Sequence, residues 1–218
     1  MTHNKGFIFD LDGVIVDTAK YHFLAWKKIA DQLDIHFTAA NNELLKGVSR
    51  VKSLDIILQL GKKDASQEDK DKWLFQKNED YLSQLVAIDS SEILPGVLKV
   101  IQFLKSNHVP IALGSASKNA RPILEKTGIL HYFDVIVDGN DVSNAKPDPE
   151  VFLIAAQLLD VKPENAIVFE DSVAGIQAAN TATMTSIGIG EATTLYEAKH
   201  IFKDFTEIEI SFIESLLK

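Results

Sequence analysis

Several kinds of residue are missing or scarce in this chain of 218 residues. It has no cysteine, which excludes disulfide bonds, thiolate metal ligands and a cysteine nucleophile. Lysine and arginine number 22 against 31 aspartates and glutamates, so the formal net charge is −9. Because nucleic acids and membrane surfaces attract basic faces, this balance argues against both as partners.

Long apolar segments are also missing. No apolar run approaches the ~18 residues of a membrane-spanning helix. The N-terminal residues Met1–Lys5 lead directly into a strand-like pattern, without the architecture of a signal peptide. We therefore expect a cytoplasmic protein with one core, or a core and a smaller insert, and nothing in the sequence demands more than a monomer.

The most informative segment is the apolar run Gly6–Phe9, which stops at two carboxylates, Asp10 and Asp12, followed by Gly13. Side chains two residues apart on a strand project to the same side, so the two carboxylates should lie close together. A divalent cation would relieve their repulsion, and an all-oxygen ligand set suits magnesium. The alternative is an acidic turn after a strand, without a metal.

The periodicity of the chain changes twice. Residues 16–88 have helical spacing and no convincing strand. Further along, apolar strands are expected at 109–114, 133–137, 166–169 and 185–189, between helices at 95–106, 119–127, 149–159 and 173–180. This alternation predicts an α/β fold with a Rossmann-like core, in which helices cover both faces of a parallel sheet. The core would comprise residues 1–15 and 89–218, and residues 16–88 would form an inserted all-helical cap domain.

Polar and charged residues suited to catalysis follow the first four predicted core strands. The second strand ends in Gly114-Ser115-Ala116-Ser117-Lys118-Asn119, Lys146 follows the third, and Glu170 and Asp171 follow the fourth. Parallel strands bring such residues to one crevice. Acids for a metal, a hydroxyl and amides for phosphate oxygens, and a lysine for charge are suited to phosphoryl transfer through an aspartyl-phosphate. Taken alone, Lys146 would more simply be a solvated turn lysine.

The order of these motifs (DxDG, SAS, KP and ED, with a helical insert after the first) resembles the haloacid dehalogenase superfamily of phosphotransferases. Within it, nearly the whole chain is similar to the β-phosphoglucomutase family. The matching segments are residues 9–15, 17–18, 21–23, 45–50, 76–78 and 115–119. The resemblance implies interconversion of β-D-glucose 1-phosphate and D-glucose 6-phosphate. It also implies one Mg²⁺ per monomer, and β-glucose 1,6-bisphosphate as intermediate and activator.

The resemblance also implies roles for individual residues of the core. Asp10 would be the nucleophile and Asp12 the general acid and base. The metal would be held by Asp10, the backbone carbonyl of Asp12, Glu170 and Asp171. The residues that bind the phosphate or the sugar from the core would be Ser115, Ala116, Ser117, Lys118, Asn119 and Lys146.

The insert would determine specificity. By resemblance, Arg50 would hold the second phosphate of the substrate, and Lys46, Gly47, Val48 and Ser49 would form a loop over the sugar. His22 and Lys77 would adjust the protonation of Asp12, and Thr18 would lie at the hinge. The plainer interpretation of His22 is a histidine on a helix surface or at an interface. The two tryptophans, Trp26 and Trp73, are expected to pack helices rather than to support a sugar.

Two other functions stay open at this point. A phosphatase acting on a small sugar phosphate would share the chemistry of Asp10 and Asp12, and differ only in whether water reaches the phospho-aspartate. A non-catalytic sugar-phosphate sensor would tolerate the loss of the nucleophile, yet every acid, the serine and the lysine are present.

Overall fold

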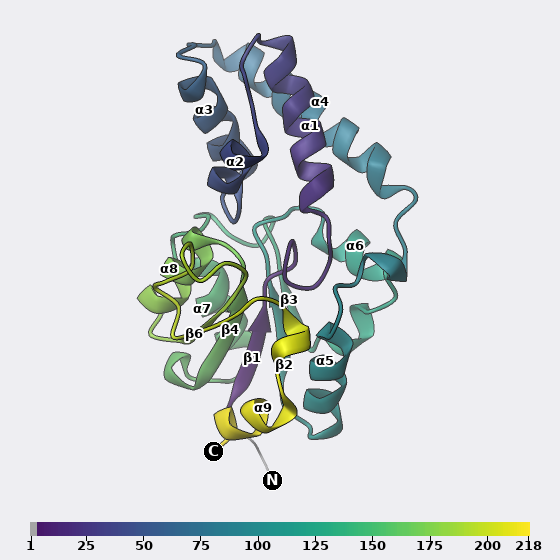
Figure 1. Ribbon diagram of the computed structural model, residues 1–218, viewed down its shortest axis with the longest axis vertical. Coiled ribbons are helices and arrows are strands. Elements are labelled where there is room, and N and C mark those ends of the chain that lie inside the picture. Colours follow the sequence, from purple (N-terminus) through teal and green to yellow (C-terminus); the bar gives the residue numbers. More distant parts are fainter. Residues whose placement is uncertain (1–3) are drawn as a thin grey trace.

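The computed structural model describes residues 4–218 and contains one parallel sheet in this range (Figure 1). Its strands are β1 (Gly6–Phe9), β2 (Ile111–Gly114), β3 (Val135–Val137), β4 (Ala166–Glu170), β5 (Thr185–Ile189) and β6 (His200–Phe202), in the order β3-β2-β1-β4-β5-β6. Every neighbouring pair is parallel. The predicted α/β fold with a parallel sheet is confirmed. The expected strand entry at residues 1–3 lies outside the described residues.

Helices cover both faces of the sheet, as expected. Phe7 and Phe9 on β1 belong to an apolar cluster with α5 (Val97–Ser106), α6 (Ala120–Lys126) and α9 (Ile210–Leu216). Ile8, on the opposite side of the same strand, packs in a second cluster with α7 (Glu150–Leu158) and α8 (Val173–Thr181). Because both faces are covered, all residues of β1, β2 and β4 are buried, which explains their nearly continuous apolar sequence.

The C-terminal part of the sheet corrects one prediction. The strand at 185–189 was expected to be the last, but β6 extends the sheet beyond it and α9 follows. β6 has only three residues, all half-buried at the sheet edge. A strand of this kind lacks the apolar run that marks the central strands.

The insert is helical and lies beyond the carboxyl ends of the strands, at the top of Figure 1. Its helices are α1 (Ala19–Gln32), α2 (Ala39–Asn42), α3 (Arg50–Leu60) and α4 (Gln67–Leu85). The predicted cap at Ser66 is present, since the Ser66 hydroxyl accepts a hydrogen bond from the Asp69 N–H. A separate apolar cluster around Trp26, Ile29 and Ile57 holds α1 and α3 together. We call residues 16–88 the cap and the rest the core.

Two chain segments connect the cap to the core, and they pair with each other. The Asp17 N–H donates to the Glu92 carbonyl, and the Leu94 N–H donates to the Ile15 carbonyl. Short 3₁₀ turns complete the described part of the chain: η1 (Glu43–Leu45), η2 (Ser90–Glu92), η3 (Leu130–Tyr132), η4 (Pro163–Asn165) and η5 (Phe205–Glu207). Within residues 4–218, no helix combines the length and the apolar character that crossing a bilayer requires.

Candidate active site

A cavity of about 430 Å³ lies between the cap and the carboxyl ends of the strands. Its walls contain most of the residues singled out from the sequence. Those from the core are Asp10, Asp12, Ala116, Ser117, Lys118, Asn119 and Asp171, and those from the cap are His22, Lys46, Gly47, Val48, Ser49, Arg50 and Lys77. The remaining predicted residues, Thr18, Ser115, Lys146 and Glu170, are buried next to this wall.

The core side of the cavity rests on a buried group of three charges. The Lys146 ammonium lies 2.6 Å from Asp10 Oδ1 and 2.8 Å from Glu170 Oε2, and it also donates to the Gly114 carbonyl at 3.1 Å. All three side chains are almost inaccessible to solvent. Burial alone would lower the pKa of Lys146, but the two carboxylates outweigh it and raise the pKa above its ordinary value. Lys146 is therefore not a solvated turn lysine.

Glu170 is held by the start of the following helix. Its Oε1 accepts hydrogen bonds from the Asp171 N–H at 3.1 Å, the Ser172 N–H at 3.0 Å and the Ser172 hydroxyl at 2.7 Å. The Ser172 oxygen in turn accepts from the Gly175 N–H, so it caps α8. The sequence reasoning assigned no role to Ser172, although a serine just before a helical pattern is a recognisable cap signal.

Three carboxylates form a possible metal site at the end of β1 and β4. Asp10, Glu170 and Asp171 can each place one oxygen within 4.8 Å of the others. Burial, followed by the neighbouring carboxylates, raises the pKa of Asp10 despite the attraction of Lys146. Burial also raises the pKa of Asp171, with Glu170 adding to the effect. A hard divalent cation would relieve this repulsion, so the donor set fits Mg²⁺.

The Asp12 carboxylate faces two residues of the cap. Its Oδ1 accepts a hydrogen bond from the Thr18 hydroxyl and lies 3.6 Å from His22 Nε2. Burial raises the pKa of Asp12, against the opposing effect of the Thr18 hydrogen bond. A carboxyl group whose raised pKa keeps it protonated more easily has a property that a general acid needs.

The cap side of the cavity gathers cations. Lys77 Nζ lies 2.8 Å from His22 Nδ1, and its ammonium is stacked over the rings of Tyr81 and Trp26 at 4.6 and 5.1 Å. Burial, followed by repulsion from Arg50, lowers the pKa of Lys77 to about 7. Burial and Lys77 likewise lower the pKa of His22. His22 thus lines the cavity with a half-buried side chain, 28% exposed, rather than an outer helix surface.

The loop before α3 brings the cap into contact with the core. Lys46 pairs with Glu43 at 3.0 Å and with the core residue Asp171 at 3.2 Å. Gly47 has a positive φ of 72°, and a Cβ at this position would collide with Ser172 Oγ. The sequence predicts this loop over the sugar, and in the structure the loop also contacts Asp171, one of the carboxylates of the candidate metal site.

Sequence reasoning missed several residues of the cavity wall. These are Ala19, Trp26, Asn42, Leu45, Val51, Ser53, Gly139, Val142, Ser143 and Ala145. Trp26 packs in the cap cluster as predicted, being only 2% exposed, and yet it also lines the cavity. The others lie in helices or turns without a distinctive pattern, so only the packing of cap on core could identify them.

Known proteins resemble this chain in sequence and structure. The haloacid dehalogenase-like hydrolase family matches residues 4–183. A β-phosphoglucomutase of Bacillus subtilis is 39% identical over 211 residues, covering 96% of this chain and 93% of that protein. A fructose-1-phosphate phosphatase of Escherichia coli is 34% identical over 188 residues, covering 84% and 95%.

Among solved structures, a β-phosphoglucomutase of Clostridium difficile matches with a TM-score of 0.93 and 43% identity, covering 98% of this chain and 96% of that one. The match spans both the sheet and the cap helices that build the cavity. The chain is therefore an enzyme that belongs to the haloacid dehalogenase-like hydrolase family.

Proposed function

We propose that the protein is a β-phosphoglucomutase, which interconverts β-D-glucose 1-phosphate and D-glucose 6-phosphate. The observation that carries this proposal is one cavity with two charged ends. The core end offers the Asp10 nucleophile beside Lys146, and the cap end offers Arg50 and Lys77. A substrate that carries phosphates at both ends matches such a cavity, because one phosphate can be transferred while the other is held.

In the proposed reaction, an oxygen of Asp10 attacks the phosphorus of a sugar phosphate and the bond from phosphorus to the sugar oxygen breaks. Asp12 gives its proton to the departing sugar oxygen and takes a proton from the hydroxyl that attacks the phospho-aspartate in the next step. The attacking hydroxyl is the 6-hydroxyl of β-glucose 1-phosphate, which takes the phosphoryl group from Asp10 and becomes β-glucose 1,6-bisphosphate. After this intermediate turns around, Asp10 takes its 1-phosphoryl group and glucose 6-phosphate is released. Lys146 and Ser115 would hold the oxygens of the moving phosphoryl group.

The proposed metal ligands are Asp10, Asp171, Glu170 and the backbone carbonyl of Asp12. A magnesium ion there would supply positive charge to offset the negative charge of the phosphoryl group. The contribution of the chain itself is to exclude water. Lys46 and Gly47 touch Asp171 and Ser172, which closes the cavity next to the nucleophile.

Phosphorus NMR tests the proposal directly. With β-glucose 1-phosphate, magnesium and a catalytic amount of the bisphosphate, we expect glucose 6-phosphate to accumulate with little inorganic phosphate. Rapid release of phosphate, no isomerisation and no effect of the bisphosphate would instead favour the second candidate, a sugar-phosphate phosphatase. That candidate is supported by the 34% identity to the E. coli phosphatase.

Arg50→Ala separates the two candidates further. In a mutase, losing the guanidinium that holds the distal phosphate should remove most of the activity, because a bidentate charged contact contributes strongly. A phosphatase of small monophosphates should barely respond. Lys52→Ala is the matched control, since Lys52 is an exposed cation in the same helix.

A further inference from the structure

The loop after β3 has contacts with the loop after β2 that the proposed mechanism does not use. The β2 loop, Ser115–Asn119, lines the core side of the cavity through its last four residues. The Ser115 N–H donates to the Val137 carbonyl at 3.0 Å, and the Gly139 N–H donates to the Ser117 carbonyl at 3.1 Å. The β3 loop therefore supports the β2 loop along its length.

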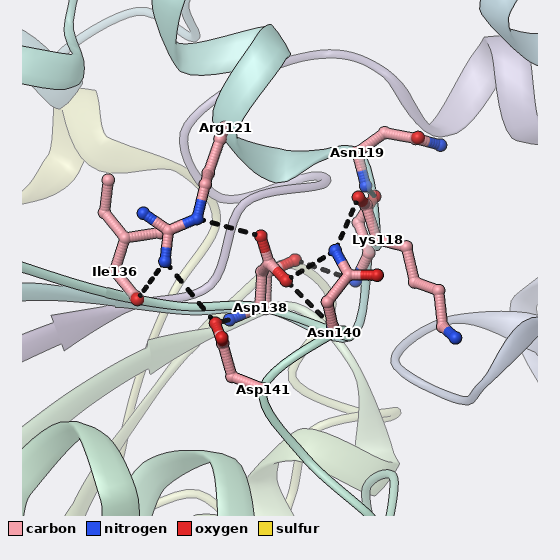
Figure 2. Close-up of polar contacts among 9 residues, drawn as sticks. Lys118, Asn119, Arg121, Ile136, Asp138, Asn140 and Asp141 are labelled. Carbon is pink, nitrogen blue, oxygen red and sulfur yellow. Dashed lines mark hydrogen bonds and ion pairs between the residues drawn. The ribbon is translucent and has the colours of Figure 1, made fainter.

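Asp138 lies at the centre of this support (Figure 2). Its side chain is buried, with 2% exposure, and its Oδ1 accepts from both the backbone N–H and the side-chain amide of Asn140, at 2.8 and 2.9 Å. Its Oδ2 lies 3.4 Å from Arg121 Nε. The carboxylate thus orients one residue of its own loop and one residue of α6, the helix that follows the β2 loop.

Each of these two partners is attached to a backbone carbonyl. Asn140 Nδ2 donates to the Lys118 carbonyl at 3.0 Å, and an Arg121 guanidinium nitrogen donates to the Ile136 carbonyl at 2.9 Å. The Lys118 side chain points away from the network in Figure 2, so the network holds only the main chain of this residue. Because peptide groups are planar, fixing the carbonyls of Ser117 and Lys118 also fixes the N–H groups that follow them.

The two loops are in direct contact, and a side chain at Gly139 would not fit between them. A Cβ at Gly139 would lie 2.5 Å from the Ala116 carbonyl oxygen. At the far end of the β2 loop, the Asn119 side chain donates to Asn78 Oδ1 in the cap at 3.2 Å. The position of the β2 loop therefore affects both the cavity wall and one contact between core and cap.

We propose that Arg121, Asp138 and Asn140 form a positioning brace, which holds the Ser117–Asn119 main chain in the conformation that binds the sugar phosphate. This inference rests on the proposed function for the identity of the ligand. None of the three residues lines the cavity, so they act through the β2 loop and not on the substrate itself.

Asn140→Ala tests the brace with little risk to folding, because Asn140 is exposed. The variant loses the bond to the Lys118 carbonyl. We expect KM for β-glucose 1-phosphate to rise roughly fivefold to tenfold, the effect of one lost hydrogen bond, with kcat changed less than about twofold. Hydrogen exchange of the peptide that covers residues 115–119 should become faster. Asp138→Asn, which removes the charge facing Arg121, should change KM and exchange in the same direction.

Asn107→Ala is the matched control. Asn107 is also exposed, and its side-chain amide also donates to a backbone carbonyl, that of Phe103 at 2.8 Å, but it precedes β2 at the opposite end of the sheet. It should leave KM, kcat and the exchange of residues 115–119 unchanged.

Two results would overturn the brace. Exchange of residues 115–119 in Asn140→Ala equal to that in the control would show that the loop does not depend on it. Faster exchange with an unchanged KM would show that loop order does not serve binding. If the wild-type protein had no mutase activity, the proposed function would be wrong. The brace would still be tested by hydrogen exchange of residues 115–119 and by calorimetric binding of glucose 6-phosphate.

Discussion

Two buried lysines have opposite electrostatics: Lys146, which lies behind the core wall of the cavity, and Lys77, which lines its cap wall. Lys146 lies between two carboxylates, and its pKa is raised. Lys77 contacts a histidine and two aromatic rings, and burial together with Arg50 lowers its pKa to about 7. Within the described residues, no carboxylate lies at ion-pair distance from Lys77.

The difference in pairing between the two lysines reflects a difference between the core and the cap. The core pairs the charges of Lys146, Asp10 and Glu170 within the chain itself, so these side chains hold one another in place. The cap holds cations whose natural partner is missing from the chain, and an anionic group of a substrate would be that partner. Burial acts to lower the pKa of both lysines, and only at Lys146 do neighbouring carboxylates reverse the direction.

The largest expected effect comes from removing the charge of Lys146 in the core. Lys146→Met leaves the buried carboxylates of Asp10 and Glu170 without their cation. We expect the free energy of unfolding to fall by about 3–5 kcal/mol, the usual cost of an uncompensated buried charge. Urea denaturation at pH 7 measures this change.

Lys105→Met is the control for this variant. Lys105 pairs with Asp134 at 2.6 Å, but both side chains are well exposed, at 33% and 43%. Removing this pair should cost less than about 1 kcal/mol. Equal losses in the two variants would show that the buried pairing of Lys146 has no special importance.

The second largest expected effect concerns the contact between cap and core at Gly47. Gly47→Ala places a methyl group against Ser172, where even the Ser172 Cβ would be only 3.0 Å away. We expect the cap to close incompletely and kcat/KM to fall by up to about 100-fold, since misplacement by about 1 Å has costs of this size. The share of phosphoryl groups lost to water should rise in the NMR assay.

Gly128→Ala separates closure from backbone strain. Gly128 has a φ of 76°, close to the 72° of Gly47, but its Cβ would meet nothing within 4 Å. Both variants carry the cost of a left-handed alanine, roughly 1–2 kcal/mol. If Gly128→Ala reduced activity as much as Gly47→Ala does, strain rather than closure would be the cause.

The smallest expected effect concerns the charge of Lys77 in the cap. The pKa of Lys77 is about 7 in the folded protein, against about 10.4 in an unfolded chain. Between these values the unfolded chain binds the additional proton, so this group makes stability rise with pH from about 7 to about 10. Below about pH 7 both states are protonated and the penalty is constant.

Lys77→Met removes a burial penalty of about 4 kcal/mol at pH 7. The lost cation–π contacts with Trp26 and Tyr81 offset about 2 kcal/mol of this. The variant should therefore raise the free energy of unfolding by about 2 kcal/mol and remove this part of the pH slope. It should also weaken binding of glucose 6-phosphate. Lys72→Met, an exposed lysine of the same helix, should leave slope and binding unchanged. A wild-type stability that is flat between pH 7 and 9 would contradict the lowered pKa of Lys77.

Much of the core could be predicted from particular residues. The strands before Asp10, Ser115 and Glu170 are apolar and fully buried. The strand before Lys146, β3, is apolar but mostly half-buried. β6 could not be predicted in this way, because its sequence His-Ile-Phe lacks the apolar run that marks even the equally short edge strand β3, Val-Ile-Val. Asp138 and Asn140 were not singled out from the sequence, since the contact of Asn140 with the Lys118 carbonyl joins loops more than 20 residues apart.

By itself, the sequence determined which segments become central strands and which carboxylates, hydroxyl and lysine stand at their ends, because alternation and burial are local properties of a strand. Only the tertiary structure decided that Lys146 is paired while Lys77 is not, that Lys46 reaches Asp171, and that Gly47 lies against Ser172. The physical reason is that pairing and close approach depend on distances between residues far apart in the chain, and packing of the cap on the core sets those distances.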